Sequence, residues 1–204
     1  MTQPLVPGLD VSRETLERLT ELEALTRKWT AKINLIAPNT VPDIWDRHIR
    51  DSAQIYSLAP DFATWADLGS GGGYPGLVIA ALAIEKASEA RITLIESDRR
   101  KSTFLRTAIR ELGLPADVIT DRIESAAPQS ADVVSARALA PLPELLEYAT
   151  RHLRPGGTAL FPKGMTRQAE IDAARAEWHF SLTETRSITQ AEAAVLRIER
   201  IDRV

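Results

Sequence analysis

The sequence predicts a doubly wound α/β domain with a mostly parallel sheet, an antiparallel C-terminal hairpin and an N-terminal helical extension. Three patterns of apolar residues lead to this prediction. Leucine, isoleucine and tryptophan recur at helical spacing before residue 60, short apolar runs alternate with longer amphipathic segments from Thr64 on, and two neighbouring strand-like segments end the chain. We therefore expect a helical extension over residues 1–62 and the main domain over residues 63–204.

The composition is that of an ordinary globular protein and excludes several kinds of chemistry. The 204 residues fit one domain, and no stretch approaches the roughly 20 apolar residues of a membrane span. The N-terminus has neither the basic start nor the apolar core of an export signal, so we expect a cytoplasmic protein that enters no membrane. The lack of cysteine excludes thiolate nucleophiles, and with 3 histidines we expect no metal site. The net charge of −3 restricts any nucleic-acid contact to a local basic patch.

The extension is expected to contain two helices. With Asp10 or Ser12 as N-cap, apolar residues three or four positions apart predict a first helix over about residues 16–33. A second amphipathic pattern predicts a helix from about residue 43 to residue 60, since prolines flank it on both sides.

The main domain is expected to alternate strands with helices, which is typical of a parallel sheet. Strands are expected at about 65–68, 91–96, 117–120, 132–135 and 158–162, and helices after Pro75 and over about 97–112, 139–153 and 167–177. Segments 178–185 and 193–201 are joined by a short polar connection and predict an antiparallel pair at the sheet edge.

A glycine-rich loop, DLGSGGGYPG, follows the first strand of the main domain. Gly69, Gly71 and Gly73 permit a tight turn and let a ligand lie directly on main-chain N–H groups. A dinucleotide fingerprint can also be matched from Gly71 to Gly76, but a lone match of that pattern is weak. The spacing of three glycines after Asp67 is that of S-adenosylmethionine sites, so we expect this cofactor.

An acidic residue follows the second strand at the position of a nucleoside anchor. Glu96 lies about 20 residues beyond the loop, where a carboxylate can accept hydrogen bonds from both ribose hydroxyls. Asp98 is the alternative, although its position also suits the cap of the next helix. Ile123 and Glu124 follow the third strand and could flank an adenine ring or lie in an exposed loop.

Several basic residues are candidates for ligand or phosphate contacts. Arg137 and Lys163 follow the fourth and fifth strands, whose C-terminal ends border the ligand site in open α/β sheets; either could instead cap carbonyls locally. Residues 97–110 contain five basic side chains and one acid, a net +4 that suits phosphate contact or a solvated helix face equally. His48 and Asp51 lie three apart on a predicted helix and could form a local pair.

These motifs together resemble the RsmG (GidB) family of bacterial small-subunit rRNA methyltransferases. The resemblance runs from about residue 16 to the C-terminus. It rests on Arg-His-Ile-x-Asp-Ser at 47–52, the glycine loop ending in Pro-Gly, Glu96-Ser97 followed by basic residues, Arg137-Ala138 and Lys163-Gly164. It implies a class I S-adenosylmethionine-dependent methyltransferase fold and methylation of guanine N7 in the decoding-region loop of 16S rRNA, with a monomer acting on the small subunit or its precursor.

The resemblance also implies roles for individual residues. It assigns Gly69 and Tyr74 to the methionine end of the cofactor, next to Gly71, and Arg137 to the same site. Ser97 and Asp98 join Glu96 at the ribose, and Ile123 and Glu124 lie at the adenine. Relatives usually have Ser-Arg-Ala where this chain has Ser-Ala-Arg-Ala at 135–138.

The chemistry of N7 methylation agrees with the composition. N7 of guanine has a free lone pair and no proton, so its methylation needs neither a general base nor a covalent intermediate. Arg137 and Lys163 are expected to hold the base or a phosphate in place. Methylation of pyrimidine C5 would need a thiolate, which this chain lacks. A small-molecule methyltransferase and a non-catalytic nucleotide-binding regulator are the two alternatives.

Overall fold

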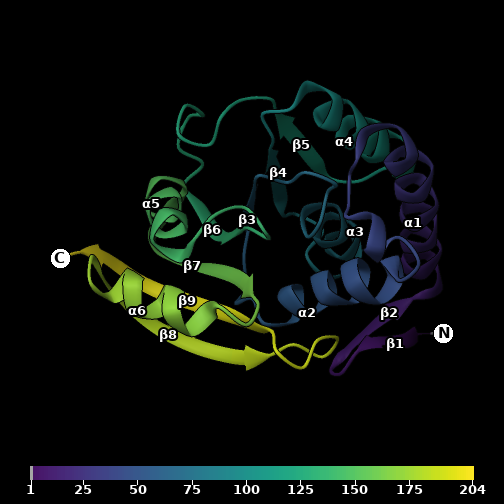
Figure 1. Ribbon diagram of the computed structural model, residues 1–204. Helices are drawn as coiled ribbons and strands as arrows, with labels where there is room; N and C mark the ends of the chain where they lie inside the picture. The colour runs from purple at the N-terminus through teal and green to yellow at the C-terminus, as the bar shows by residue number, and fades with distance from the viewer. Residues whose placement is uncertain (1) are drawn as a thin grey trace.

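A seven-stranded sheet in the order β5-β4-β3-β6-β7-β9-β8 forms the centre of the computed structural model, which describes residues 2–204 (Figure 1). Strands β3 to β7 are parallel, and β9 pairs antiparallel with both β7 and β8. The strands are β3 (Thr64–Leu68), β4 (Arg91–Ile95), β5 (Ala116–Ile119), β6 (Ala131–Ser135), β7 (Leu153–Lys163), β8 (Trp178–Arg186) and β9 (Ala194–Arg203). The predicted fold class is confirmed, including the C-terminal hairpin.

Helices cover both faces of this sheet because successive strand residues point to opposite sides. Trp65 packs in the apolar cluster under α1 (Arg13–Ile33), α3 (Gly76–Lys86) and α4 (Arg99–Leu112), whereas its neighbour Ala66 packs in the cluster under α5 (Leu142–His152) and α6 (Arg167–Arg175). Figure 1 shows the two groups of helices on either side of the sheet.

Helix α3 is apolar around most of its circumference, and the arrangement explains why. The sheet covers one side, and α1 and α2 (Asp51–Ser57) contact the other, so residues 76–83 are all buried. An all-round apolar helix is expected only where it is enclosed in this way. The extension therefore completes the core of the main domain.

The helical extension expected over residues 1–62 also contains a hairpin that the sequence analysis did not predict. Strands β1 (Thr2–Val6) and β2 (Leu9–Ser12) pair antiparallel before the first helix begins. The signal was the Pro-Gly pair between them: proline presets the first turn position, and Gly8 takes the second with φ of 80°. Ser12 then caps α1, accepting a hydrogen bond from the Thr15 amide at 3.2 Å.

The second predicted helix is divided. After a short 3-10 turn (Pro38–Thr40), residues Trp45–Arg50 are wound as a π-helix, and only Asp51–Ser57 is α-helical. A π-turn shifts the faces on which side chains project, and such turns are frequent at functional sites.

One carboxylate joins two central strands at their N-terminal ends. Asp132 accepts hydrogen bonds from the amides of Ala63 and Thr64, both at 2.8 Å, and pairs with Arg154. Burial by itself would raise the pKa of Asp132, but the Arg154 guanidinium and the backbone donors lower it to about 2.

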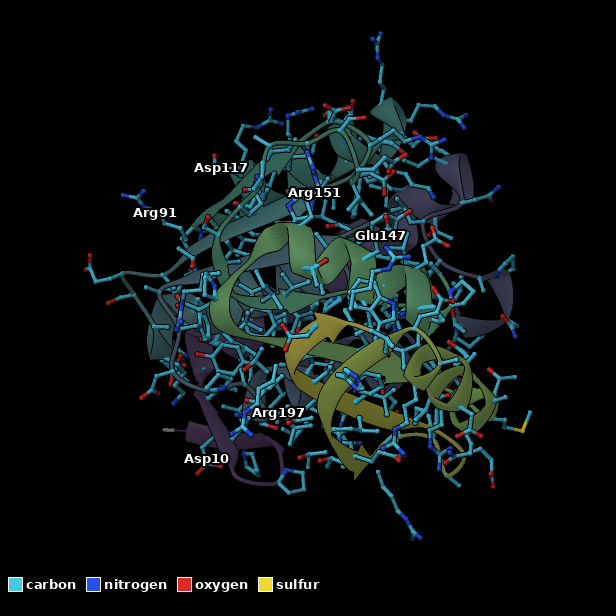
Figure 2. All side chains as sticks on the ribbon, turned by 90° about the vertical axis from the view of Figure 1, so that its left-hand side faces the viewer. Asp10, Arg91, Asp117, Glu147, Arg151 and Arg197 are labelled. Atoms are coloured by element: carbon cyan, nitrogen blue, oxygen red, sulfur yellow. The ribbon has the colours of Figure 1, made fainter. Side chains whose placement is uncertain are left out.

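We expect Asp132→Asn to lower the free energy of unfolding at neutral pH by about 1–3 kcal/mol, because the backbone donors lose a charged acceptor. A carboxyl group with a lowered folded-state pKa stabilises above its unfolded value, here 3.8, and loses that contribution as the pH falls through about 2. Urea unfolding between pH 4 and pH 2 should therefore show a smaller loss in the variant than in the wild type. Asp117→Asn, at an exposed site on β5 (Figure 2), is the control and should match the wild type.

Candidate functional site

A cleft of about 1000 Å³ opens at the carboxyl ends of the parallel strands. Such crevices are where open α/β sheets bind ligands. Its walls come from the glycine loop, the turns after β4 to β7, the segment 35–54 and the β8–β9 loop. Every site residue predicted from the sequence lines it except Asp98; those that do are Gly69, Gly71, Tyr74, Glu96, Ser97, Ile123, Glu124, Arg137 and Lys163.

The glycine loop has left-handed backbone geometry and one open face. Gly71 has φ of 53°, and a Cβ placed there would meet only the Gly69 carbonyl, at 3.7 Å, so its free side faces the cleft. A Cβ on Gly72 would lie 2.6 Å from the Leu35 carbonyl oxygen, because the extension packs directly on the loop. The loop thus leaves a main-chain surface for a ligand on one side and is closed on the other.

Glu96 lies beside this open face. One carboxylate oxygen accepts a hydrogen bond from the Gly71 amide at 2.8 Å, and the other accepts from the Asp98 amide at 2.7 Å. The side chain is buried, yet it borders the cleft. Each oxygen keeps a lone pair, so the carboxylate can still accept hydrogen bonds from a vicinal diol.

Asp98 occupies the N-cap of α4 and does not line the cleft. Its carboxylate accepts from the amides of Arg100 at 2.8 Å and Lys101 at 3.1 Å. These backbone hydrogen bonds hold the pKa of Asp98 below its ordinary value. Of the two acids, Glu96 therefore has the geometry of a nucleoside anchor.

Asp67 was not singled out as a site residue, but it supports the glycine loop from below. It is 1% exposed and accepts hydrogen bonds from the Ser135 hydroxyl at 2.7 Å and the Gly76 amide at 3.2 Å. Burial raises the pKa of Asp67 to about 6, although these hydrogen bonds act in the opposite direction. The serine of Ser-Ala-Arg-Ala thus points into the core, where it also accepts from Trp65 at 2.9 Å.

Arg137 is partly buried and has neutral hydrogen-bond partners. Its guanidinium donates to the Arg47 carbonyl at 2.9 Å and to Nδ1 of His48, and lies over the Tyr74 ring, 5.6 Å from the centroid. Burial lowers the pKa of Arg137, and Asp51 is the main group that counteracts this. A guanidinium has five N–H donors, so others remain for an acceptor in the cleft.

His48 is held as a neutral imidazole. Nδ1 accepts from Arg137, so Nε2 carries the proton and donates to the Thr40 hydroxyl at 2.9 Å. Burial, and then the charges of Arg137 and Arg47, lower the pKa of His48 to about 3. The local pair of His48 with Asp51 does not form. The π-turn sends the two side chains to different partners, and Asp51 bonds to the β8–β9 loop.

Lys163 is placed on the cleft wall, but a neighbour neutralises its charge. Nζ donates to the Ala140 carbonyl and pairs with Glu170 of α6, both at 2.7 Å. Glu170 also accepts from the Leu142 amide at 3.0 Å, so this pair fastens β7, α5 and α6 together. Ile123 is buried at the cleft rim, whereas Glu124 is exposed.

The basic residues of the stretch 97–110 lie in different environments. Lys101 lines the cleft, whereas Arg99, Arg100 and Arg110 are exposed. Arg106 instead ties α4 to the end of β5 through the Val118 carbonyl and the Thr120 hydroxyl.

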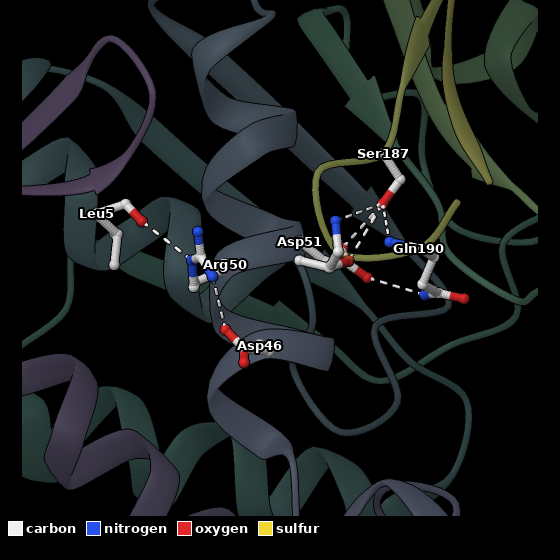
Figure 3. Close-up of polar contacts among 7 residues, drawn as sticks. Leu5, Asp46, Arg50, Asp51, Ser187 and Gln190 are labelled. Carbon is white, nitrogen blue, oxygen red and sulfur yellow. Dashed lines mark hydrogen bonds and ion pairs between the residues drawn. The ribbon is translucent and has the colours of Figure 1, made fainter. Parts of the chain in front are cut away.

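Sequence reasoning missed a second wall of the cleft, formed by α2 and the β8–β9 loop. The Asp51 carboxylate accepts hydrogen bonds from Ser187 at 3.5 Å, from Gln190 at 3.3 Å and from Thr189, and Figure 3 shows the loop folded around it. Gln54 bonds to the backbone of the same loop at two positions. These partners lie more than 130 positions apart in the chain, so no local pattern could reveal them.

No helix within residues 2–204 is long and apolar enough to cross a membrane. The same residues hold no group of three or more His, Cys, Asp and Glu side chains arranged as a metal site.

Comparisons with known proteins agree on one family. The family model of the rRNA small subunit methyltransferase G (GidB) matches residues 15–199. The chain is 50% identical to the ribosomal RNA small subunit methyltransferase G of Ruegeria sp. over 196 residues, which cover 96% of each chain. It is 49% identical to the protein of that name from Cereibacter sphaeroides over the full length of both.

Solved structures are similar in fold at low sequence identity. The ribosomal protein L11 methylase of Lactobacillus delbrueckii gives a TM-score of 0.60 at 17% identity, covering 76% of this chain and 78% of that one. The TYW2 protein of M. jannaschii, solved in complex with AdoMet, gives 0.59 at 13% identity, covering 86% and 80%. The fold is therefore that of class I S-adenosylmethionine-dependent methyltransferases.

Substitution of Gly71 by alanine should separate ligand binding from backbone strain. Gly71→Ala and Gly113→Ala both place a Cβ at a left-handed residue, with φ of 53° and 61°, so each should lower stability by about 1 kcal/mol. Gly113 has open space around it at the end of α4, away from the cleft. Titration calorimetry should show S-adenosylmethionine affinity reduced about tenfold or more in Gly71→Ala alone. Equal affinities in the two variants would contradict this description of the loop.

Proposed function

The chain belongs to the rRNA small subunit methyltransferase G family, and we propose that it methylates N7 of a guanine in the decoding-region loop of 16S rRNA. As a member of this family it is an S-adenosylmethionine-dependent rRNA methyltransferase. The cofactor supplies an electrophilic methyl group on a sulfonium sulfur. What we propose beyond this is which atom, base and rRNA loop are methylated and what the individual residues of the cleft do.

The cleft residues fit this cofactor. The open main-chain face at Gly71 leaves room for a ligand that touches the backbone, and the Glu96 carboxylate beside it would accept from the ribose hydroxyls. Ser97, Ile123 and Glu124 line the same end and would flank the nucleoside. At the other end of the loop, the partly buried Arg137 guanidinium over Tyr74 has free donors and would bind the methionine carboxylate or the acceptor nucleotide.

The observation that carries the choice of N7 is that His48, Asp67 and Asp51, the titratable groups around Arg137, are already hydrogen-bonded within the protein. Both ring nitrogens of His48 are hydrogen-bonded and its pKa is about 3. Asp67 lies under the glycine loop, bonded to Ser135 and Gly76. N7 of guanine needs no proton removed, so a site that only positions the base and excludes water is sufficient.

We also propose how the rRNA is held at the cleft. The target base lies in folded RNA and must be splayed out to enter the cleft. Lys101 lines the cleft, and Arg99 and Arg100 are exposed next to it at the start of α4, so we assign them to phosphates around the target. Lys163 would hold the base or a phosphate from the wall where it pairs with Glu170. We expect a monomer in the cytoplasm that acts on the small subunit or its precursor.

The test is transfer of radiolabelled methyl from S-adenosylmethionine to small subunits from cells that lack the enzyme. Chain cleavage at N7-methylguanosine then locates the label. We expect one labelled guanine, in the decoding-region loop. Label on another atom or another RNA would contradict the proposal, and absence of label from subunits, precursor particles and free rRNA would assign the cleft to a different substrate.

Arg137→Ala should lower kcat/KM about 10- to 100-fold, because a charge-assisted hydrogen bond to the ligand is lost. Arg137→Lys keeps the charge without the planar fork and should recover only part of the activity. Arg91→Ala is the control: Arg91 is exposed at the opposite end of the sheet and projects away from the molecule in Figure 2. Wild-type values for both single-turnover transfer and cofactor affinity in Arg137→Ala would remove this residue from the site.

A further inference from the structure

The cleft has two halves that follow the order of the strands. Glu96 and Ile123 follow β4 and β5 on one side of the glycine loop. Lys163 and the β8–β9 loop lie on the other side, beyond β6 and β7. If the first half holds the nucleoside of the cofactor, the acceptor base must occupy the second half, against the wall formed by α2 and the β8–β9 loop.

Asp51 is a carboxylate on this second wall whose charge is not cancelled by an ion pair. Its hydrogen bonds come from two hydroxyls and one amide, of Ser187, Thr189 and Gln190, all neutral groups (Figure 3). Two cations near the cleft pair with other acids, Lys163 with Glu170 at 2.7 Å and Arg50 with Asp46 at 2.9 Å. Arg137 lines the same cleft, and Asp51 is the main acid that counteracts the effect of burial on its pKa.

The β8–β9 loop holds this carboxylate in place. Gln54, one turn further along α2, donates to the Arg186 carbonyl at 2.7 Å and accepts from the Ile188 amide at 3.1 Å. The loop can therefore deliver its three donors to Asp51 without being ordered by the substrate. An ionised group fixed by neutral donors before binding can stabilise charge without a reorganisation cost.

Methylation at N7 moves a positive charge toward this wall. The N7 lone pair forms the new bond to the methyl carbon, and the old carbon–sulfur bond breaks with its electron pair remaining on sulfur. No proton is lost, so the charge of the sulfonium appears on the purine. A carboxylate near the base attracts the purine more strongly in the transition state than in the ground state, which is the condition for catalysis.

The guanine itself also presents donors in the required direction. Its N1–H and N2–H groups lie on the edge away from N7, so a base with N7 toward the glycine loop turns these groups to the opposite wall. A carboxylate oxygen with a free lone pair accepts a hydrogen bond from this edge, whereas adenine offers an acceptor at N1. One side chain can therefore contribute to the selection of guanine and to the stabilisation of its cationic form.

We propose that Asp51 is the acceptor-base residue of this enzyme: its remaining lone pair accepts a hydrogen bond from the N1–H and N2–H edge of guanine, and its charge stabilises the positive charge that methylation places on the base. This inference rests on the proposed function, since it assumes transfer to guanine N7. Arg137, the charged group that Asp51 opposes most directly in the cleft, remains the contact for an anionic ligand group.

The test compares Asp51→Asn with three other variants. Asp51→Glu keeps the charge. Gln54→Met removes the hydrogen bonds from Gln54 to the β8–β9 loop but keeps the Asp51 carboxylate. It therefore shows the effect of loosening the loop alone. Asp46→Asn is the matched control, because Asp46 is an exposed carboxylate on the same turn that pairs only with Arg50 (Figure 3).

Each variant is assayed for single-turnover methyl transfer to saturating small subunits and for cofactor affinity. The third measurement is the ratio of affinities for subunits with and without the N7 methyl group.

We expect Asp51→Asn to slow methyl transfer about 30-fold, as expected for the loss of one charge near the base in a partly shielded site. Its cofactor affinity should be unchanged, and its relative affinity for the methylated, cationic product should fall. Asp51→Glu should restore much of both, and Asp46→Asn should match the wild type. Gln54→Met should weaken binding of both kinds of subunit equally.

Two results would overturn the inference while the proposed function stands. The first is a wild-type transfer rate and product preference in Asp51→Asn. The second is an equal loss of affinity for both kinds of subunit in Asp51→Asn, as in Gln54→Met, which would make Asp51 a structural residue of the loop. Failure of the proposed function is seen separately, because wild-type protein would then leave guanine N7 unmethylated.

Discussion

The buried carboxylate of Asp67 is the interaction on which the geometry of the site depends. It lies at the end of the central strand and joins that strand to Ser135 of β6 and to the first amide of α3. The glycine loop spans the interval between these contacts, so its shape follows from them. Because a buried carboxylate without partners would be costly, the hydroxyl and amide donors are as necessary as the acid itself.

The N-terminal extension forms the other side of the same site. Leu35 packs against Gly72 so closely that no Cβ fits between them, and Thr26 of α1 hydrogen-bonds to the Tyr74 hydroxyl at 2.8 Å. His48 stacks on the Tyr74 ring, with centroids 5.0 Å apart, and binds Arg137. The glycine loop is therefore enclosed by the sheet on one side and the extension on the other. Neither part forms the cleft alone.

The charges in the cleft are arranged so that each has a distinct environment. Lys163 is neutralised by Glu170, Arg137 donates to neutral acceptors, and Asp51 is held by neutral donors. Methyl transfer to a neutral base creates no net charge but moves one from sulfur to purine. A site for this reaction needs charges of fixed position more than groups that exchange protons, and buried groups held by neutral hydrogen bonds meet that need.

The sequence alone determined the features that depend on neighbouring residues. Alternation of apolar runs identified the parallel strands and the final hairpin, and glycine spacing identified the loop that lines the cleft, because both patterns reflect local backbone geometry. The assignment of Asp98 as a helix cap followed from the same local rules. Only the tertiary structure decided the partners of His48, Asp51 and Lys163. His48 and Arg137 are 89 positions apart and Asp51 and Ser187 136 apart, so the packing of the extension and of the C-terminal hairpin, and no local preference, brings them together.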